Sequence, residues 1–295
     1  MIGKFIEYIT IERRYSQLTA AAYERDLTEL CSFLKIAPED FEPRDTTEED
    51  IKAFLIAQLD EGKSARSVRR KLSSFRSFWK YLLRIGYTDK DITARIIPPK
   101  TDKPLPVFYK EEEMQRATAH EDSDDDFVSV RDSLIIEMLY QTGMRRAELL
   151  ALKTSDVDYS LRQLKVLGKR NKERIVPIAD GLISQIERYI SYRDLLPCQE
   201  NNGELLLSEK GRPLSKTKLY EIVHGRMSEV STLKKQSPHV LRHTFATTML
   251  DNGADINTIK TLMGHANLAA TQIYTHTTFE QIRKEYKKAH PRARK

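Results

Sequence analysis

The sequence predicts a mainly α-helical fold in two domains, with one small β-hairpin in the second domain. Three observations support this prediction. Apolar residues recur at helical spacing through residues 1–96, a proline-rich stretch follows at 97–107, and a short alternating pattern interrupts the helical patterns of 108–295. A chain of 295 residues is long enough for two hydrophobic cores. We therefore expect a helical domain at 1–96, a linker at 97–107 and a second domain at 108–295.

Four helices are predicted in the first domain. An apolar stripe over residues 2–9 indicates the first helix. Ser16, Thr47 and Ser64 stand where the next three helices begin, and their hydroxyl groups suit the N-cap position. Asp50 follows Thr47 by three residues, which is close to a capping box.

The fourth helix, expected between Ser64 and Gly86, is predicted to contact DNA. Its apolar side chains share one face of the helical wheel, and basic side chains cover much of the other. Residues 64–87 contain no Asp or Glu, so no carboxylate of this segment balances the basic face. A merely solvated face is the alternative, but contact with the DNA backbone is the better interpretation. The predicted contact residues are Arg66, Arg69, Arg70, Arg76, Lys80 and Arg84.

Composition limits the kind of binding partner and the cellular compartment that can be expected. Lys and Arg number 49 against 43 Asp and Glu, for a formal charge of +6, which fits a polyanionic partner with a local contact surface. Cys31 and Cys198 indicate neither a disulfide framework nor a cysteine-based zinc site, so a reducing cytoplasm is expected. The chain has no apolar run long enough to cross a membrane, and its start lacks the apolar region of a signal peptide, so no membrane partner is expected.

The second domain is predicted as helices around one hairpin. Leu164 and Val166 alternate with polar residues, a turn follows at 168–172, and an extended pattern resumes at 175–178. A further short strand is expected at 204–207. Helices are expected over 110–120, 127–141, 144–150, 182–196, 215–230, from 238 onward, and over 255–263, 268–274 and 279–289. Lys216 and Lys218 are further candidates for DNA-phosphate contact.

Helix ends in this domain are marked by residues with special backbone preferences. Gly143 and Gly264 stand where a left-handed residue would end a helix. Arg145 is then expected in the first turn of the helix that follows Gly143. Thr278 and Gln281 have the spacing of a capping box for the last helix.

The stretch 237–276 gathers groups that suit phosphoryl chemistry. Among its residues are the permanent cation Arg242, the imidazoles of His239 and His265, which titrate near neutral pH, and the phenol of Tyr274. A helix that begins at residue 238 puts His239 and Arg242 three residues apart and therefore on one face. Each residue alone fits an ordinary structural role, so the interpretation depends on the whole set.

With these residues assembled, the chain resembles the tyrosine recombinases, or phage integrase family, especially the bacterial Xer-type integrases. The resemblance covers nearly the whole length and is carried by five boxes in order. They are Thr142-Gly143-Met144-Arg145 with Glu148-Leu149, Gly168-Lys169 with Asn171-Lys172-Glu173-Arg174 and Val176-Pro177, His239-Val240-Leu241-Arg242-His243, Leu262-Met263-Gly264-His265, and Tyr274-Thr275-His276. The chain departs from the family at Arg170, where a Gly commonly follows the hairpin lysine. A left-handed Arg170 would be strained, so Asn171 is expected to take that conformation.

The resemblance implies a C-shaped clamp of a helical core-binding domain and a tyrosine-recombinase catalytic domain. It implies that Tyr274 cuts DNA through a 3′-phosphotyrosyl intermediate and that strands exchange through a Holliday junction, without metal, ATP or other cofactor. Arg145 and Arg242 would hold the two non-bridging oxygens of the phosphate.

Four further residues receive roles from the resemblance. Lys169 would protonate the departing 5′-oxygen, and His239 would help to accept the tyrosine proton or bind phosphate. His265 would donate to the same phosphate, and Glu148 would orient Arg145. The implied assembly is a homo- or hetero-tetramer on a double-stranded recombination site in the bacterial nucleoid. The sequence leaves open a second recombinase, an accessory protein, the target site, and cis or trans docking of the last helix.

Three alternatives stand beside this interpretation. A non-catalytic DNA-binding or architectural protein would share the basic helix. A type IB topoisomerase would share the covalent chemistry but would relax DNA without strand exchange. A metallohydrolase would use His239 and His243, although Val240 stands where its catalytic Glu is expected.

Overall fold

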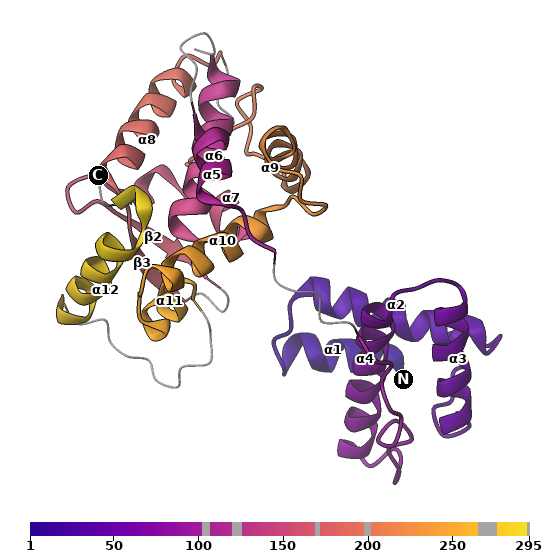
Figure 1. Cartoon of the computed structure of the whole chain (residues 1–295). Coiled ribbons are helices and arrows are strands. Elements are labelled where there is room, and N and C mark those ends of the chain that lie inside the picture. Colours follow the sequence, from indigo (N-terminus) through magenta and orange to yellow (C-terminus); the bar gives the residue numbers. More distant parts are fainter. Residues whose placement is uncertain (102–106, 120–125, 169–171, 198–201, 265–275, 294–295) are drawn as a thin grey trace. The chain divides into compact units, whose positions relative to one another are not determined.

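The computed structural model describes residues 1–101, 107–119, 126–168, 172–197, 202–264 and 276–293. The chain divides into two compact units, Met1–Pro104 and Leu105–Lys295. Helices dominate both units, and an antiparallel sheet lies in the second (Figure 1). The predicted fold class, mainly α with a small sheet in the C-terminal part, is confirmed. In the described ranges no helix combines the length and the apolarity that a membrane span requires.

Helices α1 to α4 form the N-terminal unit. Their bounds are Ile2–Ile11, Gln17–Phe33, Glu48–Asp60 and Ala65–Arg84. The predicted caps are confirmed, because Ser16 and Ser64 accept hydrogen bonds from backbone N–H groups three residues later and Thr47 forms a capping box with Asp50. The apolar face of α4 is buried, and Trp79 belongs to this core rather than to the surface.

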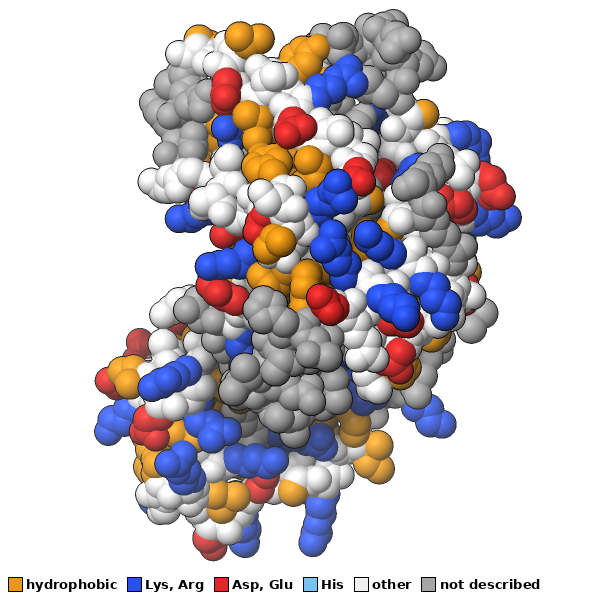
Figure 2. All heavy atoms as spheres, turned by 90° about the vertical axis from the view of Figure 1, so that its left-hand side faces the viewer, with side chains coloured by type: hydrophobic (Ala, Val, Ile, Leu, Met, Phe, Trp, Pro, Cys, Tyr) orange, Lys and Arg blue, Asp and Glu red, His pale blue; other side chains and the backbone are white. Residues whose placement is uncertain are grey.

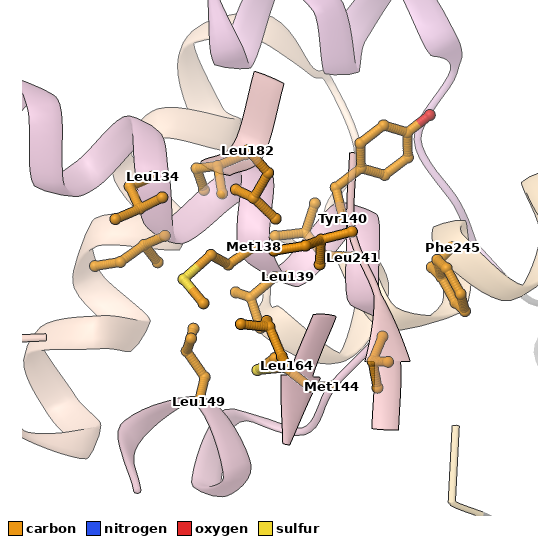
Figure 3. Close-up of a cluster of buried hydrophobic side chains, with 14 of the residues drawn as sticks. Leu134, Met138, Leu139, Tyr140, Met144, Leu149, Leu164, Leu182, Leu241 and Phe245 are labelled. Atoms are coloured by element: carbon orange, nitrogen blue, oxygen red, sulfur yellow. The ribbon is translucent and has the colours of Figure 1, made fainter. Parts of the chain in front are cut away.

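The C-terminal unit is organised around one helix that is buried along nearly its whole length. Its helices are α5 (Glu111–Thr118), α6 (Phe127–Thr142), α7 (Arg146–Leu150), α8 (Asp180–Arg193), α9 (Lys216–Val230), α10 (Pro238–Asp251), α11 (Ile256–Leu262) and α12 (His276–Ala289), with 3₁₀ turns at Thr154–Asp156 and Pro291–Ala293. The buried helix is α6, which is apolar on several faces. In Figure 3 its side chains Leu134, Met138 and Leu139 lie among Leu182 of α8 and Leu241 of α10.

The sheet has three strands in the order β1-β2-β3, all antiparallel. The strands β2 (Gln163–Leu167) and β3 (Glu173–Pro177) are the predicted hairpin, in which Val166 lies opposite Arg174. The strand β1 (Val157–Asp158) was not predicted, because two residues are too few to show an alternating pattern. The short strand expected at 204–207 is wrong, since Glu204 and Leu207 form only isolated bridges.

The C-terminal helix packs in cis against its own unit. Ile282, Tyr286 and Ala289 of α12 are buried in the same core as α6 and α10, and His290 is fully buried behind them. The predicted start of the last helix at residue 279 is wrong, because α12 already begins at His276, and the side chain of Thr278 lies outside the described residues. The expected helix 268–274 lies outside the described residues.

Candidate active site

Arg145 lies at the turn that joins α6 to α7. Gly143 ends α6 in the predicted left-handed conformation, with φ of 57°. Arg145 is then the N-cap of α7, so its expected place in the first helical turn is wrong. The reason is Glu148, whose carboxylate accepts from the Arg145 backbone N–H at 2.8 Å and thereby holds Arg145 in an extended conformation.

Glu148 also binds the side chain of Arg145. Nη1 of Arg145 donates to Oε1 of Glu148 at 2.7 Å, while the arginine side chain keeps 42% of its surface exposed. Burial raises the pKa of Glu148, but hydrogen bonds from Arg174 and from Arg145 outweigh burial, and the net pKa is lowered. The carboxylate is therefore ionised at neutral pH, and it fixes a guanidinium that still faces solvent.

Arg242 of α10 is buried and joins three separate segments of the unit. Its Nη1 donates to the Gly143 carbonyl at 2.5 Å and its Nη2 to the Met263 carbonyl at 2.6 Å. Burial and then the nearby cation of Arg145 lower the pKa of Arg242 to about 10. Arg242 remains charged at neutral pH, so the unit holds a buried cation beside a second one.

The two arginines converge on the end of α11. Nη2 of Arg145 donates to the carbonyl of Gly264 at 3.3 Å, next to the Met263 carbonyl that Arg242 binds. Gly264 has φ of 65°, the left-handed conformation predicted for it. The backbone just before His265 is thus fixed by two guanidinium groups.

An open cleft of about 600 Å³ adjoins these arginines. It is lined by Arg145, Arg146, Tyr220, Ser237, Pro238, His239, Arg242, His243 and Met263. His239 follows Pro238 at the start of α10, as predicted, and is largely exposed. Partial burial of its ring, then Lys235 and Arg242, lower the pKa of His239, so the neutral imidazole that can accept a proton prevails at pH 7.

Ser237 occupies the N-cap position of α10, but its side chain makes no capping hydrogen bond. Its buried hydroxyl has no hydrogen-bond partner among the described residues. The predicted helix start is therefore correct, although Ser237, a residue type that suits an N-cap, does not cap the helix with its side chain.

Lys169, His265 and Tyr274 lie outside the described residues. The glycines that precede the first two are described. A Cβ atom built on Gly168 would lie 3.7 Å from Oε1 of Glu148, and Gly264 accepts from Arg145. The chain therefore reaches the Arg145–Glu148 pair immediately before each of these two candidate residues.

The basic residues predicted to contact DNA are only partly free to do so. Arg70 donates to both oxygens of buried Asp26, at 2.5 and 2.7 Å, and Ser74 donates to the same carboxylate at 2.8 Å. Lys71 pairs with Glu29. Residues 64–87 lack carboxylates, but α2 supplies Asp26 and Glu29, so the inference that almost no acidic residue balances the basic residues of this helix is wrong.

Other basic residues of α4 hold the unit together or remain exposed. Arg76 donates to the Ile96 carbonyl at 2.7 Å, Arg84 to the Tyr8 hydroxyl at 2.6 Å, and Arg69 reaches the Pro99 carbonyl at 3.5 Å. Arg66 and Lys80 are exposed. Arg76, Lys80 and Arg84 nevertheless share an open groove of about 520 Å³ with Arg13, Ser73 and Ser77.

In the second unit, Lys216 is exposed at the start of α9, and Nζ of Lys218 lies 4.0 Å from Oε1 of Glu209. On the face of the chain drawn in Figure 2, Lys and Arg side chains are interspersed with Asp and Glu. This distribution agrees with the small charge excess, which points to local rather than continuous basic surfaces.

Comparison with known proteins identifies the family. The model of the phage integrase family matches residues 108–281, and that of the phage integrase N-terminal SAM-like domain matches residues 2–86. Tyrosine recombinase XerD of Oceanobacillus iheyensis is 37% identical over 295 residues, covering 99% of this chain and 98% of the relative. The chain belongs to the phage integrase family. It is a tyrosine site-specific recombinase, and the resemblance to the Xer type is confirmed.

Another relative and two solved structures share the length or the fold of this recombinase. Tyrosine recombinase XerC of Listeria innocua is 37% identical, covering 98% of this chain and 97% of the relative. The structure of XerH bound to its difH substrate before cleavage matches with a TM-score of 0.68, 23% identity, and 96% and 83% coverage of the two chains. A λ integrase (75–356) dimer bound to a COC′ core site matches with a TM-score of 0.67 and 21% identity, and the match covers 90% of this chain and 93% of that one. These two structures show that the fold is shared.

Sequence reasoning assigned no individual role to Arg174 of this recombinase. Arg174 lies on β3 with only 4% of its side chain exposed, and it donates to Glu148 and to the Leu262 carbonyl, each at 2.7 Å. The signal was present in the alternation of the strand, because Arg174 and buried Val176 fall on the same face. A charged residue on the buried face of a strand requires a partner of opposite charge, and here that partner is Glu148 of the candidate site.

Proposed function

We propose that this recombinase cuts and rejoins double-stranded DNA at a specific site through a 3′-phosphotyrosyl intermediate formed by Tyr274. The observation that carries the proposal is that Arg145, Arg242 and His239 line one open cleft. Two guanidinium groups can bind both non-bridging oxygens of one phosphodiester, and they stabilise the charge that the transition state adds. These three residues offer phosphate binding and a proton acceptor in one cleft, which supports the proposal.

In the proposed reaction the phenolic oxygen of Tyr274 attacks phosphorus and the bond to the 5′-oxygen breaks. His239, neutral because its pKa is lowered, accepts the phenolic proton. Lys169 donates a proton to the departing 5′-oxygen, which leaves as a hydroxyl group. The phosphate stays esterified to the tyrosine, so a 5′-hydroxyl of another strand can reverse the reaction without ATP.

The proposed site uses fixed cations where other phosphoryl-transfer enzymes use metal ions. Arg145 and Arg242, with His265 as a further donor, supply the charge and the hydrogen bonds at the phosphate. Cleavage is therefore expected to proceed unchanged in EDTA. Loss of cleavage in EDTA, restored by a divalent cation, would favour the metallohydrolase alternative.

The proposed substrate is a pair of recombination sites, and the proposed assembly is four protomers, identical or of two kinds, on a Holliday junction. The similar XerH and λ integrase structures contain recombination-site DNA. Exposed basic residues of α4 and α9, such as Lys80 and Lys216, are proposed to contact the DNA backbone. The N-terminal unit would bind the core site, and the C-terminal unit would perform catalysis. We place this activity on the bacterial nucleoid, in chromosome dimer resolution or in movement of an integrative element.

A nicked suicide substrate tests the proposal. Sequencing the DNA that the protein holds covalently in its host gives the target, and a nicked duplex of that sequence traps the cut strand. The wild type should form an adduct that survives denaturing electrophoresis, and Tyr274→Phe should bind the duplex equally well and form none. An adduct with Tyr274→Phe would remove Tyr274 from its role. A two-site exchange assay separates recombination from relaxation by a topoisomerase.

A further inference from the structure

Arg174 is a buried arginine at the meeting point of three segments of the candidate site. From β3 its Nη2 donates to Oε2 of Glu148, and its Nε donates to the carbonyl of Leu262 at the end of α11. Gly264 packs directly on its guanidinium, since a Cβ atom at Gly264 would lie 3.1 Å from Nη1. A Cβ atom at Gly168 would lie 3.6 Å from the same nitrogen. One side chain therefore touches α7, the end of α11 and the base of the hairpin.

Each of these segments leads to a residue with a proposed catalytic role. Glu148 holds Arg145 through both its backbone N–H and its Nη1. The Leu262–Gly264 segment ends where His265 begins, and its carbonyls also receive Arg145 and Arg242. Gly168 precedes Lys169. Arg174 itself does not line the cleft that Arg145, His239 and Arg242 share.

The chemistry of the contacts requires an arginine at this position. The fork of a guanidinium presents donors in two fixed directions, and here one direction meets a carboxylate and the other a backbone carbonyl. An ammonium group is a compact charge on a flexible stem and cannot keep both contacts in that geometry. The flat face of the guanidinium also leaves room for the close approach of Gly264.

We infer that Arg174 is a positioning residue for DNA cleavage, which sets the direction of the Arg145 guanidinium through Glu148 and fixes the backbone that leads to His265. The inference rests on the proposed function of the same site. Arg174 touches neither the phosphate nor the nucleophile in this role. Its replacement should therefore slow cleavage while DNA affinity stays close to that of the wild type.

The first test needs no DNA. Arg174 contributes to the lowered pKa of Glu148, so Arg174→Gln should raise the pKa of that carboxyl. Carboxyl-carbon NMR titration of the full chain, with the Glu148 signal assigned by Glu148→Gln, measures the change. Arg131→Gln is the matched control, because Arg131 is equally buried but pairs with Asp132 and Glu209. An unchanged pKa of Glu148 in Arg174→Gln would overturn the inference.

The second test measures single-turnover cleavage of the nicked suicide substrate. Arg174→Lys should cleave about 10 to 100 times more slowly than the wild type, a loss of the size that follows from removing the residues that orient metal ligands. In Arg174→Gln the acid limb of the pH–rate profile, which in the wild type follows the loss of neutral His239, should become steeper. The reason is that activity is then also lost as pH falls through the raised pKa of Glu148. Adding Glu148→Gln should remove that second loss. A merely structural role would lower thermal stability and leave the profile in place.

The outcomes separate this inference from the proposed function. If Arg174→Lys cleaves the substrate as fast as the wild type, with the adduct still on Tyr274, the inference alone is overturned. Failure of the wild type to form any adduct would overturn the proposed function, while the NMR titration would still decide whether Arg174 controls Glu148. If Arg174→Gln does not fold, Arg174→Lys and Arg131→Lys, compared for cleavage and melting temperature, decide the question.

Discussion

Arg145 and Arg242 donate to the carbonyl oxygens of two consecutive residues, Gly264 and Met263, at 3.3 and 2.6 Å. Two guanidinium groups that repel each other are thus held side by side, and the repulsion contributes, after burial, to the lowered pKa of Arg242. The carboxylate of Glu148 offsets part of this positive charge, but it is buried, whereas the Arg145 side chain that it binds stays 42% exposed. A phosphodiester entering the cleft would find both cations already in place, which is the preorganisation that phosphoryl transfer requires.

Replacing Arg145 with Lys should remove the fork and keep the charge. We expect cleavage of the suicide substrate to fall by about 10²- to 10³-fold, the typical cost of losing one preorganised donor, with little change in DNA affinity. Quenched-flow cleavage and a filter-binding assay measure the two quantities. Arg146→Lys is the control, because Arg146 is the exposed neighbour in the same cleft, and its loss should be below about tenfold. Equal losses in the two variants would contradict a special role for Arg145.

His290 should make the C-terminal unit sensitive to acid. The ring is fully buried, and burial lowers the pKa of His290 to about 3 against an ordinary value of 6.5, so the folded state binds fewer protons than the unfolded state. Its contribution to stability is complete above pH 6.5 and is lost as pH falls toward 3. Between pH 6.5 and 5 the free energy of unfolding should drop by about 2 kcal/mol from this group.

Denaturant unfolding of the wild type and His290→Gln at several pH values measures this dependence. The glutamine variant should be less stable at pH 7 but should show a shallower fall on acidification. Parallel curves for the two proteins would assign the acid sensitivity to other groups.

Gly143 should resist replacement by Ala for two reasons. Its φ of 57° is left-handed, and an added Cβ would lie 2.3 Å from Cδ1 of buried Phe245. We expect Gly143→Ala to lower the free energy of unfolding by about 2 kcal/mol or more, from backbone strain and overpacking. Gly225→Ala is the control, because Gly225 lies within α9 with open space around it, and the change should stabilise by about 0.5–1 kcal/mol. Thermal melting of both variants checks the sign of each effect.

Asp26 should stabilise the N-terminal unit through its bonds to Arg70 and Ser74. Asp26→Asn keeps the shape and removes the charge that Arg70 binds with both nitrogens, so we expect a loss of about 2 kcal/mol. Trp79, the single tryptophan of the sequence, is buried in this unit, so its fluorescence reports unfolding there. Glu29→Gln, at a carboxylate that is 39% exposed whereas that of Asp26 is buried, should cost below about 1 kcal/mol. A larger loss for Glu29→Gln than for Asp26→Asn would contradict this assignment.

Interactions between near neighbours in the chain could be predicted from the sequence. The caps at Ser16, Thr47 and Ser64 form as expected, because each joins groups three residues apart. Gly143 and Gly264 adopt the left-handed conformation, because that backbone favours glycine whatever packs around it. The order of the five boxes likewise indicated the family, which the comparisons confirm.

The tertiary structure decided which groups distant in the sequence form ion pairs and which short strands pair. The sequence around Arg70 does not indicate that Asp26 is its partner, and the sequence around Glu148 does not indicate Arg174. Both ion pairs join segments that only folding brings together. The strand β1 exists only through its pairing with β2. A buried charge must find its counter-charge anywhere in the fold, whereas a cap or a turn is completed within a few residues. For that physical reason the sequence by itself determined the elements and the family, and the structure alone showed how Arg174, Glu148 and Arg145 are connected.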